Sequence, residues 1–494
     1  MDILQIIKKI KEYWLSLDKI DKYIILLLVF SFLIRITFLT YSPLRGWDET
    51  VYMNLGSDLS HNPFFYSLEK SGWNDFISIP EPVYEWPNIG FRAPLLPYLL
   101  SIFYSLNLIF LIPFLIPFFA TLSVFLVYIL GKNMFNKKIG FYGATLFSLV
   151  PINILSSEKI WTDSLVVFFL LLTFISFWKG YEKNDNKHKV FFGIFLALSL
   201  MTRYTTLWIT PVFLLYFLIR DKSLKFMLDK YLWRAILSFF VVLIPWFIYG
   251  CVFYQNPIGG FIHGFKAAAY WGGVQSWSFF IDNSWLIFSI IGWLFLFSII
   301  YIFYKKEFLR RDIYLLLLWS LFFSSIVMAM PHKEERFITP IIPAICLISA
   351  FFVYQLKKYK NIFFIMICLT LLYSSYLLYK ANVKESLNTV NICFSSGNNF
   401  LATETGVDSL IITNQDSIVH YYTQRDTIIY PKVWSLKNLK TTIDVMYPYS
   451  NVYVYFSNYD MYIPSRIKND LDENFEKIYE CNIEIGHSYV YKYR

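Results

Sequence analysis

The chain has 494 residues, of which 56% are hydrophobic and 21% aromatic, and its formal net charge at pH 7 is +9. Apolar runs near or above the ~20 residues needed to cross a bilayer recur along it, which excludes an ordinary soluble globular protein. The positive charge does not indicate a nucleic-acid partner, because the basic residues form short clusters between apolar runs, as in cytoplasmic loops of membrane proteins. The sequence therefore predicts a polytopic α-helical membrane protein.

The first apolar run, from Tyr23 to Tyr41, follows more than twenty mixed and charged residues and has no small-residue cleavage site. We therefore expect an uncleaved signal anchor with a cytoplasmic N-terminus. Placing the lysine and arginine clusters in the cytoplasm predicts about eleven membrane-spanning helices. They lie near residues 23–41, 109–130, 139–154, 163–179, 189–202, 205–219, 233–253, 284–304, 313–329, 337–355 and 361–379.

Two adjacent carboxylates, Asp48 and Glu49, follow the first apolar run at the start of a long acidic loop, residues 42–108, which we place outside the cytoplasm. A helix turns about 100° per residue, so Asp48 would share a face with Tyr52 while Glu49 points to the side. One acid can then meet a substrate while the other holds the loop. The simpler interpretation is a solvated helix start, where acidic residues are favoured.

The same loop carries Trp47, Trp73 and Trp86, a pattern typical either of a substrate platform or of an aromatic belt at the membrane interface. Residues 93–106, which follow Arg92, are apolar but number only about fourteen, too few for a comfortable crossing. We therefore expect an interfacial or re-entrant helix on the outer side.

Two other predicted outer loops carry isolated ionisable residues. Asp163 closes the loop at 156–163, where it could simply cap the following helix. Arg203 lies between two apolar runs with hardly any loop. It either snorkels to the membrane surface or binds a phosphate.

Five ionisable residues run without interruption from His332 to Arg336, between two predicted spans. Charges beside a bilayer are unfavourable unless they meet a ligand or each other, and Glu334 or Glu335 can pair with Lys333 or Arg336. If the next helix begins early, His332 and Arg336 lie four residues apart on one face. Such a cationic face would suit a lipid phosphate, which arginine can grip with two parallel N–H groups.

Residues 381–494 lack membrane-like apolar runs. Short apolar segments separated by helical patterns predict a soluble α/β accessory domain with a parallel sheet, outside the cytoplasm and following a membrane domain at 1–380. The strands are expected at 409–413, 426–430 and 451–456, and the helices at 416–423 and 435–446. Cys393 and Cys481 are the cysteines of this region and either form a disulfide or remain two thiols.

Four short motifs together carry a family resemblance. They are the Asp48-Glu49 pair, Arg-x-Pro-Leu-x-Pro at 92–97, Thr-Asp at 162–163 and His-Lys-Glu-x-Arg-Phe at 332–337. Over roughly residues 20–380 the chain resembles the C-type (GT-C) integral-membrane glycosyltransferases. It is most similar to family 39, the dolichyl-phosphate-mannose protein mannosyltransferases and the aminoarabinose transferase of lipid A. The last motif is also similar to the α-mannosyltransferases of family 22.

The resemblance implies that the first-loop acid, Asp48 with Glu49 beside it, is the catalytic base. It places Thr-Arg-Tyr at 202–204 where the family often has Thr-Lys-Tyr, so that a cation is retained at Arg203. Members of the family differ in their use of a divalent metal, and no metal-ligand spacing is visible in this chain. The metal therefore stays open, and no other cofactor is expected.

These observations predict an inverting-type glycosyltransferase. It would move a hexosyl or pentosyl group from a polyprenyl (dolichyl) phosphate donor to a protein, lipid or glycan acceptor, at the outer face of the cell (plasma) membrane. Such a reaction needs a base for the acceptor hydroxyl and cations for the leaving phosphate. The predicted site residues are Asp48 and Glu49 for catalysis, Arg203, His332, Lys333 and Arg336 for the phosphate, and Arg92 and Asp163 for the substrate loop.

The alternative function is that of a flippase or transporter for a polyprenyl-linked glycolipid. Transporters tend to bind their substrate near the bilayer midplane, on interrupted helices that often belong to repeated halves. In this chain no repeat is visible and the polar groups gather at one predicted membrane face, which favours the transferase.

Overall fold

The computed structural model describes residues 15–39, 45–64, 66–68, 71–72, 92–270, 274–356, 360–429, 451–459 and 465–493, with the single residues 5, 436, 439 and 440. Trp73 and Trp86 of the first loop therefore lie outside the described residues. The chain divides into two compact units. The first comprises Met1–Thr37, Pro113–Cys251 and Phe265–Leu377, and the second comprises Phe38–Ile112, Val252–Gly264 and Leu378–Arg494.

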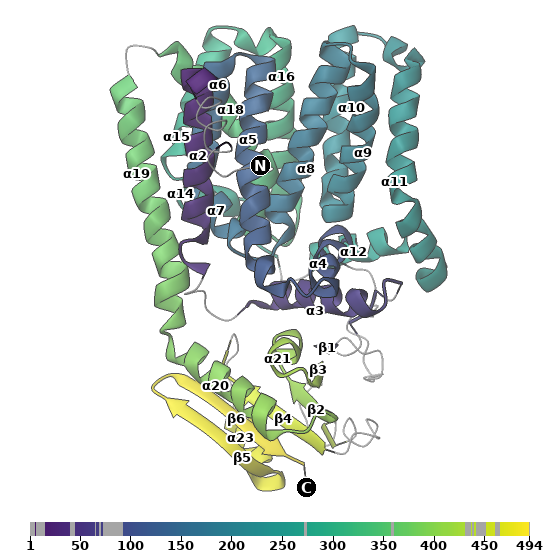
Figure 1. Ribbon diagram of the computed structural model, residues 1–494, viewed down its shortest axis with the longest axis vertical. Coiled ribbons are helices and arrows are strands. Elements are labelled where there is room, and N and C mark those ends of the chain that lie inside the picture. The colour runs from purple at the N-terminus through teal and green to yellow at the C-terminus, as the bar shows by residue number, and fades with distance from the viewer. Residues whose placement is uncertain are drawn as a thin grey trace. The chain divides into compact units, whose positions relative to one another are not determined.

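The first unit is a bundle of apolar helices that run alongside one another (Figure 1). Among the described residues, six helices are long and apolar enough to cross a membrane. They are η2–α5 (Ile109–Met134), α8–η3 (Thr162–Glu182), α11 (Lys230–Tyr254), α16–η7–α17 (Arg311–Ala329), η8–α18 (Glu335–Gln355) and the part of α19–η10 at Phe363–Lys384. The protein is therefore an integral membrane protein with a helical core.

A seventh crossing is formed if α6 (Lys137–Leu149) and α7 (Pro151–Ser157) are counted together, although they meet at a bend of 63°. Val150 at this bend has an extended backbone (φ −58°, ψ 123°). The ring of Pro151 explains it, because a proline disfavours helical geometry in the residue before it.

The predicted total of about eleven crossings is not confirmed. Each predicted segment contains a helix among its described residues, but several helices are too short or too charged to pass as spans by length and composition. Helix α2 (Lys19–Ile36) includes four charged side chains. Apolar runs alone do not show charged helix ends or the breaks between helices. The other short helices are α9 (Asn186–Thr202), η4 (Tyr204–Ile209), α10 (Thr210–Asp221), η5 (Leu224–Leu228), α13 (Phe279–Asp282), α14 (Ser284–Phe288), α15 (Ile290–Tyr304) and η6 (Glu307–Leu309).

The second unit combines the described part of the first loop with the C-terminal residues. Helix α3 (Trp47–His61) packs closely on α4 (Leu95–Ser105), since a Cβ on Gly56 would lie 2.7 Å from the Cβ of Leu100. Helix α4 has only eleven residues, in agreement with the expectation of a short helix there. The chain re-enters this unit through the start of α12 (Gly259–Tyr270) and again after α19 (Lys360–Tyr379).

A six-stranded sheet forms the centre of this unit, with strand order β1-β3-β2-β4-β6-β5 (Figure 1). Its strands are β1 (Ser71–Gly72), β2 (Ser409–Thr413), β3 (Asp426–Ile429), β4 (Asn451–Ser457), β5 (Glu476–Ile483) and β6 (Gly486–Lys492). The three predicted strands, β3, β2 and β4, are parallel as expected, and β1, which was not predicted, pairs in parallel with β3. Helix α21 (Asp416–Thr423) matches its predicted range. Most of the helix predicted at 435–446 lies outside the described residues.

The predicted parallel sheet is incomplete, because β5 and β6, which were not predicted, form an antiparallel hairpin beside β4. Glu484 turns the chain with a positive φ of 48°, so the hairpin needs only a short turn and no crossover helix. Strand β5 is an edge strand with mostly exposed side chains, so it lacked the apolar run that marks a buried strand.

Helices cover both faces of the sheet. Leu410 and Ile412 of β2 face α23 (Ser465–Asn474), whereas Ile411 between them packs with α20 (Thr389–Glu404) and α21, as alternation along a strand requires. Cys393 of α20 and Cys481 of β5 are disulfide-bonded, which decides between the two alternatives predicted for them. Trp47 of α3 packs against the α20–α21 face.

Candidate active site

Helix α3 begins at Trp47 because Glu49 holds its first turn. One Glu49 carboxylate oxygen accepts the backbone N–H of Gly46 at 3.0 Å, and the other pairs with Arg45 at 3.1 Å. The Glu49 side chain is only 1% exposed. A carboxylate at this position satisfies an N–H that the helix itself leaves unpaired and interacts favourably with the helix dipole. Glu49 is thus committed to the start of the helix.

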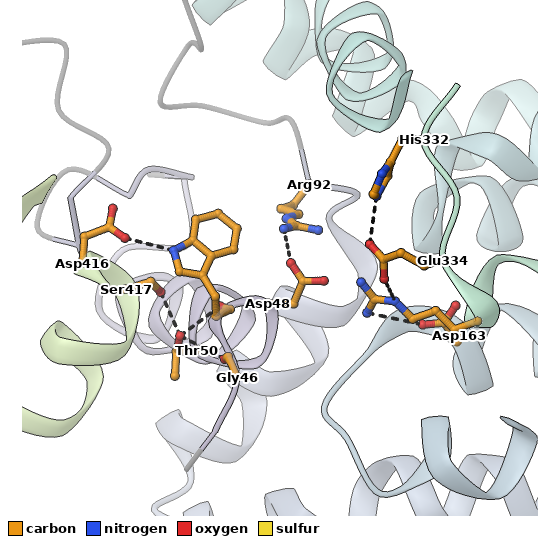
Figure 2. A network of polar contacts seen from close by, with 11 residues as sticks. Gly46, Asp48, Thr50, Arg92, Asp163, His332, Glu334, Asp416 and Ser417 are labelled. Atoms are coloured by element: carbon orange, nitrogen blue, oxygen red, sulfur yellow. Dashed lines mark hydrogen bonds and ion pairs between the residues drawn. The ribbon is translucent and has the colours of Figure 1, made fainter. Parts of the chain in front are cut away.

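Asp48 lies on a different side of α3, where it forms an ion pair with Arg92 (Figure 2). Its side chain is 19% exposed, so water or a hydroxyl group can reach it. The Arg92 guanidinium also lies over two aromatic rings, 5.5 Å from the centre of Trp47 and 5.4 Å from that of Tyr52. Because Arg92 contacts both Asp48 and Tyr52, these residues share the face predicted from their four-residue spacing.

Hydrogen bonds from α3 also reach the first turn of α21 (Figure 2). The Trp47 indole N–H donates to the Asp416 carboxylate at 2.9 Å, and the Thr50 hydroxyl lies 3.1 Å from that of Ser417. The Asn54 amide donates to the Ser417 carbonyl oxygen at 3.0 Å. Burial raises the pKa of the Asp416 carboxyl to about 6, while the hydrogen bond from Trp47 acts in the opposite direction.

A separate ionic cluster occupies the first unit. Asp163 lies in the first turn of α8 (Thr162–Phe177) and its side chain is 2% exposed. It forms an ion pair with Arg203, the residue that ends α9, and its other oxygen lies 3.8 Å from an Arg336 nitrogen. The helix cap considered for Asp163 is not its role, since Trp161 occupies the cap position. Asp163 is instead a buried carboxylate that holds two arginines.

Glu334 links the other members of this cluster. It accepts a hydrogen bond from Arg336 Nε at 2.5 Å, and its other oxygen lies 3.1 Å from His332 Nε2 (Figure 2). The expectation that His332 and Arg336 share a helix face is wrong. Helix η8 (Glu335–Ile341) begins after His332, and the two residues are brought together by Glu334. The predicted pairing within the run is confirmed for Glu334 and Arg336.

Aromatic rings hold both arginines, and a small, largely apolar hollow lies beside one of them. The Arg336 guanidinium lies 4.0 Å from the ring centre of Trp161, and that of Arg203 lies 4.5 Å from Phe337. This hollow is lined by Arg203, Thr205, Trp208, Phe323, Val327 and Phe337, among others. Arg203 therefore contributes a positive charge to a largely apolar lining.

Lys333 is buried, and its side chain bonds to backbone carbonyl oxygens. Its ammonium donates to the carbonyl oxygens of Met330 at 2.6 Å and Gln275 at 3.1 Å, and its backbone N–H donates to the Gln275 side chain at 2.8 Å. These bonds tie the two loop segments together. Phosphate binding by Lys333 would use the third of its ammonium hydrogens.

The described residues include no group of three or more histidine, cysteine, aspartate or glutamate side chains placed to hold a metal ion. Residues near the candidate side chains that were not predicted as site residues include Arg45, Trp161 and Asp416. The four-residue spacing of Arg45 and Glu49 was a usable local signal. Asp416 had none, because its partner Trp47 is 369 residues away in the sequence.

Comparisons with known proteins agree in fold. Residues 91–249 match the family described as dolichyl-phosphate-mannose-protein mannosyltransferase. ArnT from Cupriavidus metallidurans bound to undecaprenyl phosphate is 12% identical, with a TM-score of 0.69 over 95% of this chain and 98% of that one. Archaeal oligosaccharyltransferase AglB from Archaeoglobus fulgidus, in complex with an inhibitory peptide and a dolichol-phosphate, is 14% identical, with a TM-score of 0.64 over 95% and 74%. No curated protein matches the chain in sequence.

Proposed function

We propose that this chain, which its family match and its fold relate to the C-type integral-membrane glycosyltransferases, moves one sugar from a polyprenyl phosphate to an acceptor. The observation that carries the proposal is the ionic cluster of Asp163, Arg203 and Arg336, with a small, largely apolar hollow beside Arg203. A polyprenyl-phosphate sugar likewise joins a charged phosphate to an apolar tail. The similar structures of ArnT and AglB are themselves bound to polyprenyl phosphates.

Arg203 and Arg336 are the proposed phosphate ligands. A guanidinium has five N–H donors in a planar fork whose geometry matches two oxygens of a phosphate. Asp163 and the rings of Trp161 and Phe337 hold the two forks in place, which reduces the entropy lost when a ligand binds. His332 joins them through Glu334, and Lys333 secures the loop on which they lie.

Asp48 is the proposed general base. As the acceptor oxygen bonds to the anomeric carbon of the sugar, its proton passes to the Asp48 carboxylate. The bond between that carbon and the phosphate oxygen breaks, and the phosphate leaves with the electron pair as polyprenyl phosphate. Attack from the face opposite the leaving group inverts the anomeric configuration. Arginines near the phosphate stabilise the charge that develops on it.

The environments of the two adjacent carboxylates support this assignment. Glu49 is buried and has both oxygens engaged at the start of α3, so it is a positioning residue. Asp48 is partly exposed, and Arg92 and the rings around it fix its orientation. A group that must receive a proton from a bound hydroxyl has to be reachable, and Asp48 fulfils this condition where Glu49 does not.

We infer the compartment of the reaction from the disulfide. Disulfides persist in oxidising compartments and are rare in the cytosol, so Cys393–Cys481 supports an extracytoplasmic second unit. Helix α3 belongs to that unit and is hydrogen-bonded to α21, which gives Asp48 the same compartment. The clusters of lysine and arginine between the spans favour the same orientation independently. We therefore place the reaction at the outer face of the cell membrane.

The proposal is tested with the purified full-length protein in liposomes that hold a panel of polyprenyl-phosphate sugars, each labelled in the sugar. Transfer of one label to an added protein, lipid or glycan acceptor fraction, with loss of transfer in Asp48→Asn, is the expected result. Movement of the intact labelled lipid between leaflets without transfer would establish the transporter instead. Omission and re-addition of a divalent metal in the same assay determines whether the reaction needs one.

A further inference from the structure

The C-terminal sheet has the feature at which parallel α/β sheets ordinarily bind ligands. Strand β2 is followed in the chain by β3 on one side of it, whereas β4 lies on its other side and pairs onward with β6. The connection after β2 therefore leads to one side of the sheet and the connection after β4 leads to the other. In parallel α/β sheets, ligands ordinarily bind at the carboxyl ends of two neighbouring strands that are connected in this way. Asp416 and Ser417 stand at the end of β2, at the start of α21, and Tyr459 follows β4.

Helix α3 occupies this position. The Trp47 indole donates to Asp416, and Trp47 packs, as Tyr459 does, against the apolar cluster that includes Ile411 and Tyr455. One turn later Thr50 bonds to Ser417, and a further turn on Asn54 donates to the same residue. Both Asp416 and Ser417 are buried. Hydrogen bonds at the end of β2 therefore hold the helix that carries Asp48.

We propose that Asp416 is a positioning residue for Asp48, which it orients through Trp47 and Arg92. Asp416 fixes the Trp47 ring by accepting its N–H. That ring and the ring of Tyr52 flank the Arg92 guanidinium, which in turn pairs with Asp48. The inference rests on the proposed function, because it assumes that Asp48 acts on the substrate. It gives the C-terminal region a role in the rate of the reaction.

The substitutions follow the chain of contacts. Asp416→Ala removes the acceptor for the indole N–H, whereas Asp416→Asn keeps an oxygen there and should retain most of the activity. Trp47→Phe keeps a ring beside Arg92 but loses the donor. Asp472→Ala is the matched control, since Asp472 lies in the same unit on α23 and accepts a hydrogen bond from Tyr491 on the other face of the sheet.

Two measurements on the purified full-length protein separate positioning from stability. The first is kcat and donor KM with the labelled donor. We expect Asp416→Ala to lower kcat by about tenfold to a hundredfold with donor KM within about twofold, because a misplaced catalytic group loses rate and not affinity. The second is amide hydrogen exchange, which should accelerate in α3 and the first turn of α21 but not in β4 or β6.

The outcomes are distinct. Loss of kcat in Asp416→Ala, its rescue in Asp416→Asn and local acceleration of exchange in α3 would support positioning. Normal kcat and unchanged α3 exchange in Asp416→Ala would overturn it, and so would faster exchange throughout the unit, which is the sign of a merely structural role. A wild-type protein that transfers no sugar from any donor would refute the proposed function, and the exchange of α3 would still decide whether Asp416 holds that helix.

Discussion

Replacing each of the two adjacent carboxylates by its amide should separate catalysis from helix formation. Asp48→Asn keeps the size of the side chain and an oxygen for Arg92 but removes the basic carboxylate. The Asp48–Arg92 pair is about one-fifth exposed, and pairs open to solvent stabilise a protein by at most ~1 kcal/mol, so the variant should fold. General-base catalysis is typically worth ~10²–10⁴ in rate, and we expect that loss in kcat with donor KM unchanged.

Glu49→Gln should have the opposite profile. Glutamine offers one oxygen where the two of Glu49 serve Gly46 and Arg45, and it removes the negative charge from the first turn of α3. Loss of a cap and of a favourable dipole interaction costs ~1–2 kcal/mol together. The melting temperature should fall, while kcat at a temperature where the protein is folded should change by less than about tenfold.

The assay measures initial rates at saturating acceptor over a range of labelled donor, with thermal unfolding followed on the same preparations. The assignment would be reversed if Asp48→Asn kept near-normal turnover while a folded Glu49→Gln were inactive. If both variants remained active, the base would lie elsewhere, and Asp163 would be the next carboxylate to replace.

Three further predictions use the same protein. Arg336→Ala should lower kcat/KM for the donor about tenfold to a hundredfold, because a charge-assisted contact contributes ~1.5–3 kcal/mol, and Arg336→Lys should recover part of the loss. Unchanged donor kinetics would leave the cluster a structural role only. Burial raises the pKa of Asp416 from 3.8 to about 6, so its ionisation opposes folding as the pH rises through 6, by about 3 kcal/mol in full. Asp416→Asn should therefore lose less stability than the wild type between pH 4.5 and pH 7.5 in thermal unfolding, and equal losses would contradict this. In intact cells carrying a Cys251→Ser background, an impermeant thiol reagent should label Val407→Cys, whose parent residue is 73% exposed, and spare Lys138→Cys; the reverse pattern would invert the assigned orientation.

Local periodicity predicted the parts of this molecule that depend on near neighbours. The shared face of Asp48 and Tyr52, the short helix after Arg92 and the strand of residues 409–413 follow from spacing and apolar pattern alone. The hairpin of β5 and β6 did not, since an exposed edge strand with charged residues lacks an apolar run. The number of membrane crossings also depends on where charges and prolines end each helix, which apolar runs do not show.

Contacts between distant segments left no signal in the sequence. The run from His332 to Arg336 was recognisable as a charged cluster, but the carboxylate that holds Arg336 and Arg203 belongs to another helix, α8. The side chains that fix the start of α3 on the C-terminal sheet are 363 to 377 residues away in sequence. A single sequence cannot pair such positions, because the pairing depends on the final packing of whole elements.

The order of the two acids in α3 has a physical reason. The third residue of a helix can reach back to the N–H before its first residue, and glutamate has the length to do so, as Glu49 does with Gly46. The residue before it is turned by about 100°, toward Arg92 and the ring of Tyr52, and a shorter aspartate there stays near the backbone and keeps a fixed position. With the two residues exchanged, the aspartate would be too short to cap and the longer acid would gain rotamer freedom at the exposed position. An Asp-Glu pair in this order at the start of a helix therefore provides one fixed, reachable carboxylate and one buried support.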